Sequence, residues 1–230
     1  LERIKYLNKC LYLTPSTAQP DRTFYVGIGH GHDALAALAE GLTDQVFGVD
    51  PYIGGHGNDD RDRDGLSEII STLGIAGRFG FEKTTIQEYL DTPFEPFDRV
   101  ICNDVLHHIY VTPKLLTRTP ERDGAIAFFM RLRQLVVPGG LLVVADIGRN
   151  GLRQWYHRIA RPLGIATFRG NYIRKQPWQE WDELLQGAGW ERLSLHNYVP
   201  YGLRRQRPIL DNWLGRMTLC PKYILTYRNR

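Results

Sequence analysis

Three glycines and one aspartate have the types and the spacing of a nucleotide-binding site. Gly27-Ile28-Gly29-His30-Gly31 lies between a short apolar run and a segment rich in alanine and leucine. Without side chains, the backbone can turn sharply there and approach a ligand closely. Asp50 lies 23 residues after Gly27, at the end of the next apolar run, where its carboxylate could bind both ribose hydroxyls. The combination predicts an adenosine-type cofactor; the alternative is a structural turn and a surface aspartate.

The residue at position 32 separates two classes of cofactor. A dinucleotide-binding loop has a further glycine three positions after its second one, which seats the pyrophosphate at the start of a helix. This chain has His32 at that position. A nicotinamide dinucleotide is therefore disfavoured.

Two adjacent histidines could move a proton. His107 and His108 follow the apolar run 99–102 at the expected entry to a helix, and histidine titrates near neutral pH. Either residue is a candidate general base. The alternative is that both pack or form hydrogen bonds at the start of the helix, because a base must first reach the proton that it removes.

These residues must be positioned by a chain that alternates strand-like and helix-like segments from Thr23 to Ile147. Such alternation is typical of a parallel sheet covered by helices. Asp33 could cap the first helix, and Pro138-Gly139-Gly140 is expected to end the third. The expected strands are 24–26, 46–49, 78–83, 99–102 and 141–145, and the expected helices are 33–42, 66–73 and 125–137, with a turn entering a further helix at 104–110.

The alternation of strand-like and helix-like segments stops after Asp146. Residues 148–176 are basic, aromatic and interrupted by proline and glycine, so we expect an inserted cap there. A helix at 177–188 and strands at 190–195 and 222–227 follow, with the last two strands antiparallel. The expected organisation is an N-terminal lid segment, 1–22, followed by one domain, 23–230, that contains the cap.

The composition is that of an ordinary globular domain. The chain has 230 residues, of which 43% are hydrophobic and 23% charged, enough to bury a full core. The sequence lacks an apolar stretch of the roughly 18 to 20 residues that a membrane span needs. Cys10, Cys102 and Cys220 have no metal-binding or disulfide spacing. This use of cysteine fits a reducing cytoplasm, which is the expected location. The opening residues do not have the pattern of a secretory signal; the alternative is a chain cleaved from a precursor.

Positive charge gathers in the last third of the chain. Residues 149–175 contain seven basic residues and no acidic one, and residues 204–230 contain seven more with Asp211 as the single acid. This surface could attract an anionic small molecule, a nucleic acid or an acidic membrane face. The alternative is a solvated face without a partner.

The order of these motifs resembles that of the class I S-adenosylmethionine-dependent methyltransferases. The matching segments are 26–31, 49–51, 97–109 and 137–146, with a closing helix end at 187–190 and a final strand at 223–227. The resemblance implies an α/β fold: a Rossmann-like seven-stranded, mostly parallel sheet with an antiparallel final strand, helices on both faces and a small cap insertion. It also implies S-adenosyl-L-methionine as the cofactor.

The resemblance assigns roles to individual residues. Gly27 and Gly29, in the loop with Ile28 and Gly31, would pass under the methionine part of the cofactor, and Asp50 would hold the ribose. The residues expected around the adenine and the sulfonium are Pro51 or Tyr52, Thr85, Ile86 and Asn103. The family usually has an acid two residues before its first glycine, where this chain has Tyr25. This departure affects the anchoring of the cofactor's amino group.

Metal sites are not expected. Asp104 and Asp146 could jointly hold a divalent cation, as in catechol-type methyltransferases, but the acid–asparagine pair expected after the fifth strand is missing because Ile147 follows Asp146. Residues 60–65 begin like a calcium loop, yet Ser71 occupies the position of the bidentate glutamate. We expect a solvated loop at 60–65.

The resemblance implies transfer of a methyl group to oxygen, nitrogen or carbon of a small acceptor, anionic or lipophilic. Aromatic residues of the cap could stack on it, namely Trp155, Tyr156, His157, Phe168 and Tyr172. One alternative is an RNA methyltransferase, favoured by the basic last third but lacking a recognisable RNA-binding module. The segment 103–106 is not the element of base-amino methyltransferases, so DNA adenine methylation is not expected. Another alternative is a catalytically silent binding protein, which Tyr25 makes conceivable. The sequence indicates no oligomeric state.

Overall fold

The computed structural model describes residues 21–54, 58–109, 119–148, 177–199, 203, 205, 207–218 and 222–230. The expected lid segment lies outside these residues except for Asp21 and Arg22, and the expected cap with its aromatic residues lies outside them except for Gly148. Arg22 begins the first strand and therefore belongs to the sheet. None of the helices in the described part of the chain is both long and apolar enough to cross a membrane.

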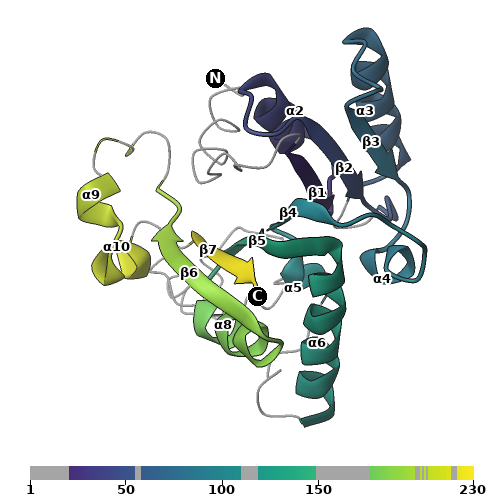
Figure 1. Ribbon diagram of the computed structural model, residues 1–230. Helices are drawn as coiled ribbons and strands as arrows, with labels where there is room; N and C mark the ends of the chain where they lie inside the picture. The colour runs from purple at the N-terminus through teal and green to yellow at the C-terminus, as the bar shows by residue number, and fades with distance from the viewer. Residues whose placement is uncertain are drawn as a thin grey trace, which may run out of the picture.

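A seven-stranded sheet forms the centre of the fold, in the order β3-β2-β1-β4-β5-β7-β6 (Figure 1). β7 is antiparallel to both of its neighbours, whereas the first five strands are parallel to one another. The expected mostly parallel sheet with an antiparallel end is confirmed. The strands are β1 (Arg22–Val26), β2 (Gln45–Val49), β3 (Phe79–Glu82), β4 (Phe97–Asn103), β5 (Val136–Ile147), β6 (Trp190–Asn197) and β7 (Lys222–Asn229).

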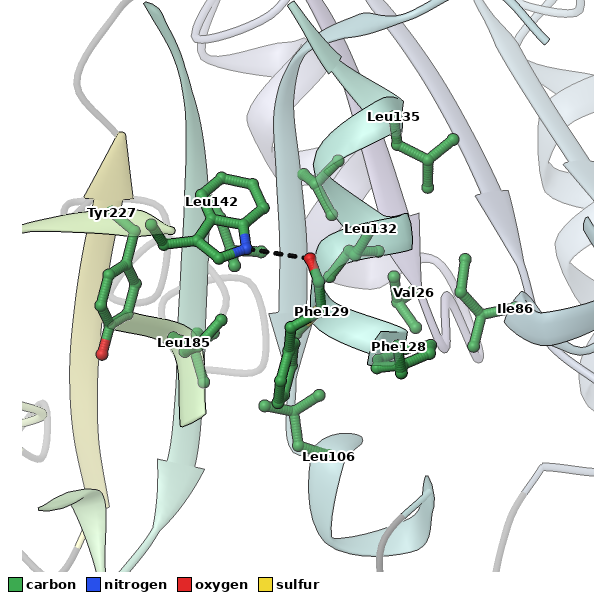
Figure 2. Close-up of a cluster of buried hydrophobic side chains, with 14 of the residues drawn as sticks. Val26, Ile86, Leu106, Phe128, Phe129, Leu132, Leu135, Leu142, Leu185 and Tyr227 are labelled. Carbon is green, nitrogen blue, oxygen red and sulfur yellow. Dashed lines mark hydrogen bonds between the residues drawn. The ribbon is translucent and has the colours of Figure 1, made fainter. Parts of the chain in front are cut away.

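Helices cover both faces of the sheet because successive strand side chains point to opposite sides. In β1, Phe24 and Val26 pack in one core cluster and Tyr25 packs in the other. The first cluster joins the sheet to α6 (Thr119–Leu132) and α8 (Trp178–Gly187), and Figure 2 shows part of it. The second joins the sheet to α2 (His32–Ala39) and α3 (Asp60–Thr72). The remaining helices are α4 (Ile86–Tyr89), α5 (Leu106–Ile109), α9 (Arg207–Leu210), α10 (Trp213–Thr218) and the 3-10 helix Arg133–Leu135.

The structure corrects the expectation of a solvated loop at 60–65, because α3 begins at Asp60. The side chain of Asp59 accepts hydrogen bonds from the backbone of Arg61 and Asp62, and the side chain of Asp62 accepts one from the backbone of Asp59. This reciprocal arrangement satisfies backbone donors that the first turn of a helix leaves unpaired. The aspartates therefore start a helix, which the calcium-loop comparison did not reveal.

Two other helix ends also differ from the expectation. Gly31, not Asp33, is the N-cap of α2, and no side-chain hydrogen bond caps this helix. The third expected helix ends at Leu132, and the chain is extended again from Val136 onwards. Val136 already pairs with Phe97 of β4, and its carbonyl accepts a hydrogen bond from Asn229 Nδ2, so strand pairing outweighs helix propagation before the proline is reached.

Candidate active site

A cavity of about 810 Å³ opens at the carboxyl ends of β1, β2 and β4. Ligands of open α/β sheets bind at this end of the strands. All nine residues predicted to contact the cofactor line this cavity: Gly27, Ile28, Gly29, Gly31, Asp50, Pro51, Thr85, Ile86 and Asn103. His108 lines it too, whereas His107 does not. The roles of these residues remain predictions, but the fold brings nearly all of them to one place.

The glycine loop is shaped for close approach to a ligand. Gly27 and Gly29 have φ angles of 70° and 54°, in the left-handed region that favours glycine. The backbone N–H groups of Gly27 and Ile28 both donate to the carbonyl of Val49, which joins the loop to the end of β2. A Cβ atom on Gly29 would lie 2.8 Å from Asn58 Nδ2. A side chain at this position would therefore displace the Asn58 amide.

Asp50 binds the glycine loop through the backbone of Gly29. Its Oδ2 accepts hydrogen bonds from the backbone N–H of Gly29 at 3.1 Å and from Asn58 Nδ2 at 2.9 Å. Its Oδ1 accepts one from the backbone N–H of Tyr52 at 3.0 Å. A carboxylate offers about four acceptor sites, so these bonds orient Asp50 while leaving capacity for a ribose hydroxyl. Asn58 had no signal in the sequence, because nothing in its neighbourhood marks it as a partner of Asp50.

Of the two residues proposed to pack on the adenine, only Pro51 lines the cavity. Tyr52 is 2% exposed, and its hydroxyl donates to the carbonyl of Gly29 at 2.8 Å. Burial and the neighbouring Asp50 carboxylate raise the pKa of Tyr52 well above its ordinary value, so it remains a neutral hydrogen-bond donor that supports the loop. Ile53, which is 83% exposed, lines the cavity beside Pro51 and offers an apolar surface instead.

The two histidines on α5 have different surroundings. His107 is buried, and its Nδ1 lies 2.7 Å from Asp146 Oδ1 at the end of β5. His108 lines the cavity, with its ring 4.4 Å from the ring of His107. Burial first, and the neighbouring His107 second, lower the pKa of His108 below 6.5. His108 is therefore neutral near pH 7 and able to accept a proton, whereas His107 has no access to the cavity.

A chain of polar contacts is centred on Asn103 at the end of β4. Asn103 Nδ2 donates to Asp33 Oδ2 in a short hydrogen bond, and Asn103 Oδ1 accepts from Lys222 Nζ at 2.9 Å. Lys222 Nζ also contacts Asp104 Oδ2 at 2.5 Å. Asp33, Asn103 and Asp104 line the cavity. Sequence reasoning missed Lys222, because it lies 119 positions from Asn103 and only the antiparallel end of the sheet brings it near.

The charges of the cavity suit a cationic ligand. Three carboxylates line it, those of Asp33, Asp50 and Asp104, and the described lining residues contain no lysine or arginine. S-adenosylmethionine has a positive sulfur and an ammonium group, whereas a pyrophosphate would meet unfavourable charge here. The glycine loop offers the close backbone approach that this cofactor needs, and Asp50 is predicted to supply the ribose contact. The residues present therefore fit S-adenosylmethionine. The described residues contain no cluster of metal ligands.

A sheet of this order with a glycine-lined acidic cavity is the architecture of a class I methyltransferase. The sequence profile of a methyltransferase domain matches residues 5–195. The chain therefore belongs to this family, which confirms the expected enzyme class, an S-adenosylmethionine-dependent methyltransferase, and its cofactor. No curated protein sequence matches the chain.

Solved structures share the fold at low sequence identity. Geranyl diphosphate C-methyltransferase from Streptomyces coelicolor, in complex with Mg²⁺, geranyl diphosphate and S-adenosylhomocysteine, has a TM-score of 0.63 and 14% identity over 100% of this chain and 80% of its own. An O-methyltransferase family 2 protein from Planctomyces limnophilus, in complex with apigenin, has a TM-score of 0.60 and 13% identity, and the match covers 97% of this chain and 56% of its own. The [4+2]-cyclase SpnF has a TM-score of 0.59 and 15% identity, and the match covers 97% of this chain and 80% of its own.

Proposed function

We propose that this protein transfers a methyl group from S-adenosylmethionine to oxygen, nitrogen or carbon of a small acceptor that is lipophilic or anionic. The observation that carries the proposal is the acidic cavity itself, which combines a glycine loop, the Asp50 carboxylate and a neutral histidine. Two solved relatives of the fold support the acceptor class, because one is in complex with apigenin and the other with geranyl diphosphate.

The cofactor, when bound, supplies an electrophilic methyl group on a positive sulfur. The protein has two tasks: to align the acceptor with that methyl group and, where the acceptor needs it, to remove a proton. Gly27 and Gly29 let the backbone approach the ligand, and Asp50 would hold the ribose hydroxyls. Thr85, Ile86 and Pro51 would surround the adenine.

His108 is the better of the two candidate bases. It lines the cavity beside Asp104 and Ile109, and its lowered pKa keeps the imidazole unprotonated near pH 7. His107 is bonded to Asp146 and packs its ring against that of His108. We assign His107 a positioning role, because a side chain outside the cavity has no path to the acceptor's proton.

Two other functions remain as alternatives to this proposal. An RNA methyltransferase would be favoured by the basic last third of the chain, but the sequence contains no recognisable RNA-binding module. A catalytically silent binding protein would bind the cofactor without turnover. Methyl transfer to small acceptors distinguishes both from the proposed function.

The first test is calorimetric titration with S-adenosylhomocysteine, with NADH in parallel and Asp50→Ala as the control variant. We expect micromolar-order binding of S-adenosylhomocysteine, loss of this binding in the variant and no binding of NADH. The second test incubates the protein with S-adenosylmethionine carrying a deuterated methyl group and a panel of phenols, prenyl diphosphates, carboxylic acids and RNA. Mass spectrometry should find the labelled methyl group on a small acceptor; label on RNA alone, or on nothing while the cofactor binds, would refute the proposal.

A further inference from the structure

Position 25 has no contact with the cavity in this protein. The family usually has an acid there, and this chain has a tyrosine. Tyr25 is 4% exposed and packs in the core cluster that joins the sheet to α2 and α3, and it is not among the residues that line the cavity. Any group that binds the cofactor's α-amino group must therefore come from another element.

Asp33 brings a carboxylate into the cavity from that other element. It lies in the first turn of α2, directly after the glycine loop, and lines the cavity together with Gly27 and Asn103. Asn103 Nδ2 donates to Asp33 Oδ2. This bond fixes one oxygen of the Asp33 carboxylate, and a carboxylate is the group that pairs with an ammonium ion in a charge-assisted hydrogen bond.

Lys222 determines which way the amide of Asn103 faces. The Lys222 side chain is 12% exposed, and its ammonium group donates to Asn103 Oδ1 at 2.9 Å and contacts Asp104 Oδ2 at 2.5 Å. An ammonium group donates only, so the amide must present its oxygen to Lys222 and its NH₂ group to Asp33. A lysine on β7 thus orients, through one amide, a carboxylate on α2.

We propose that Asp33 binds the α-amino group of S-adenosylmethionine and replaces the acid that is absent from position 25, with Asn103 and Lys222 as positioning residues. This inference rests on the proposed function, because it concerns the same cofactor. The attraction is between a carboxylate and an ammonium group, a charge-assisted hydrogen bond of the stronger kind. Asp104 also lines the cavity, where its Oδ2 contacts Lys222 Nζ at 2.5 Å.

The experiment compares two proteins, each with two ligands, so that the effect of the carboxylate can be separated from the effect of the amino group. S-adenosylhomocysteine and its deamino analogue, in which hydrogen replaces the α-amino group, are titrated calorimetrically into the unaltered protein and into Asp33→Asn. We expect Asp33→Asn to weaken the binding of S-adenosylhomocysteine by at least about tenfold, because a charge-assisted hydrogen bond is lost. Binding of the deamino analogue should change by less than about twofold.

Two control variants complete the design. Glu40→Gln makes the same acid-to-amide change at the exposed far end of α2 and should leave both affinities unchanged. Tyr25→Phe should also leave the affinity for S-adenosylhomocysteine unchanged. The inference is wrong if Asp33→Asn weakens both ligands equally, which would show a structural role, or weakens neither. If the unaltered protein binds neither ligand, the proposed function itself is wrong. This outcome differs from one in which the unaltered protein and Asp33→Asn bind S-adenosylhomocysteine equally well, which would refute only the role of Asp33.

Discussion

His107 and Asp146 form a buried pair that joins α5 to the end of β5, with 2.7 Å between Nδ1 and Oδ1. The other carboxylate oxygen of Asp146 is buried without a hydrogen-bond partner among the described residues. Because the pair lies next to His108 rather than in the cavity, we interpret it as the support on which the cavity-lining histidine rests.

The first prediction concerns this support. Asp146→Asn removes the charge and leaves the buried imidazole with a weaker acceptor, so we expect a loss of about 1–3 kcal/mol in the free energy of unfolding. Urea titration followed by circular dichroism measures the loss. Asp64→Asn, an exposed aspartate at the surface of α3, is the matched control and should lie within about 0.5 kcal/mol of the unaltered protein. Equal stability of the two variants would contradict the interpretation.

The second prediction concerns pH. The folded protein lowers the pKa of His108 below 6.5, and a base works only when unprotonated, so the acid limb of kcat/KM for a proton-donating acceptor should lie below pH 6.5. His108→Gln should abolish that limb and lower kcat. The same shift makes the stability of the fold depend on pH. Because His108 binds its proton more readily in the unfolded chain than in the folded protein, its contribution to the free energy of unfolding falls as pH drops below 6.5. A limb unchanged in His108→Gln would exclude His108 as the base.

The third prediction uses the geometry of the glycine loop. Gly29→Ala places a Cβ atom 2.8 Å from Asn58 Nδ2 at a φ of 54°. It should weaken the binding of S-adenosylhomocysteine by about tenfold or more, because the Asn58 amide must move and its hydrogen bond to Asp50 is disturbed. Gly41→Ala is the matched control. Its φ is 67°, but no atom lies within 4 Å of the added Cβ. It should cost about 1 kcal/mol of stability and leave binding unchanged. Equal binding losses in the two variants would point to general destabilisation.

The fourth prediction concerns the ion pair that joins the start of β1 to β4. Arg99 is 1% exposed, and its guanidinium lies 3.0 Å from Asp21 Oδ2. Asp21→Ala leaves a buried positive charge, so we expect a loss of about 3–5 kcal/mol, measured by urea unfolding. The double variant Asp21→Leu with Arg99→Met should lose less than Asp21→Ala alone, because it removes both charges. A larger loss in the double variant would indicate that the pair itself stabilises the fold.

Local patterns in the sequence were sufficient to predict the strands of the sheet, the glycine loop after the first strand and the position of Asp50 at the end of the second. Strand periodicity, glycine spacing and the end of an apolar run each reflect backbone chemistry that neighbouring residues determine. Together with the resemblance to the class I methyltransferases, these patterns selected nine candidate cofactor-binding residues, and all nine line one cavity with His108. Sequence patterns misjudged the start of α3, where the side chain of Asp62 accepts a hydrogen bond from the backbone of Asp59, and the end of α6, beyond which Asn229 Nδ2 donates to the carbonyl of Val136.

Only the tertiary structure separated His107 from His108, because adjacent residues on a helix point in different directions and no local signal says which one meets Asp146. Only the tertiary structure joined Asp33, Asn103 and Lys222, which come from α2, β4 and β7. The physical reason is the same in both cases: a contact between residues far apart in the chain depends on the order in which strands pair, and the residue types alone do not encode that order.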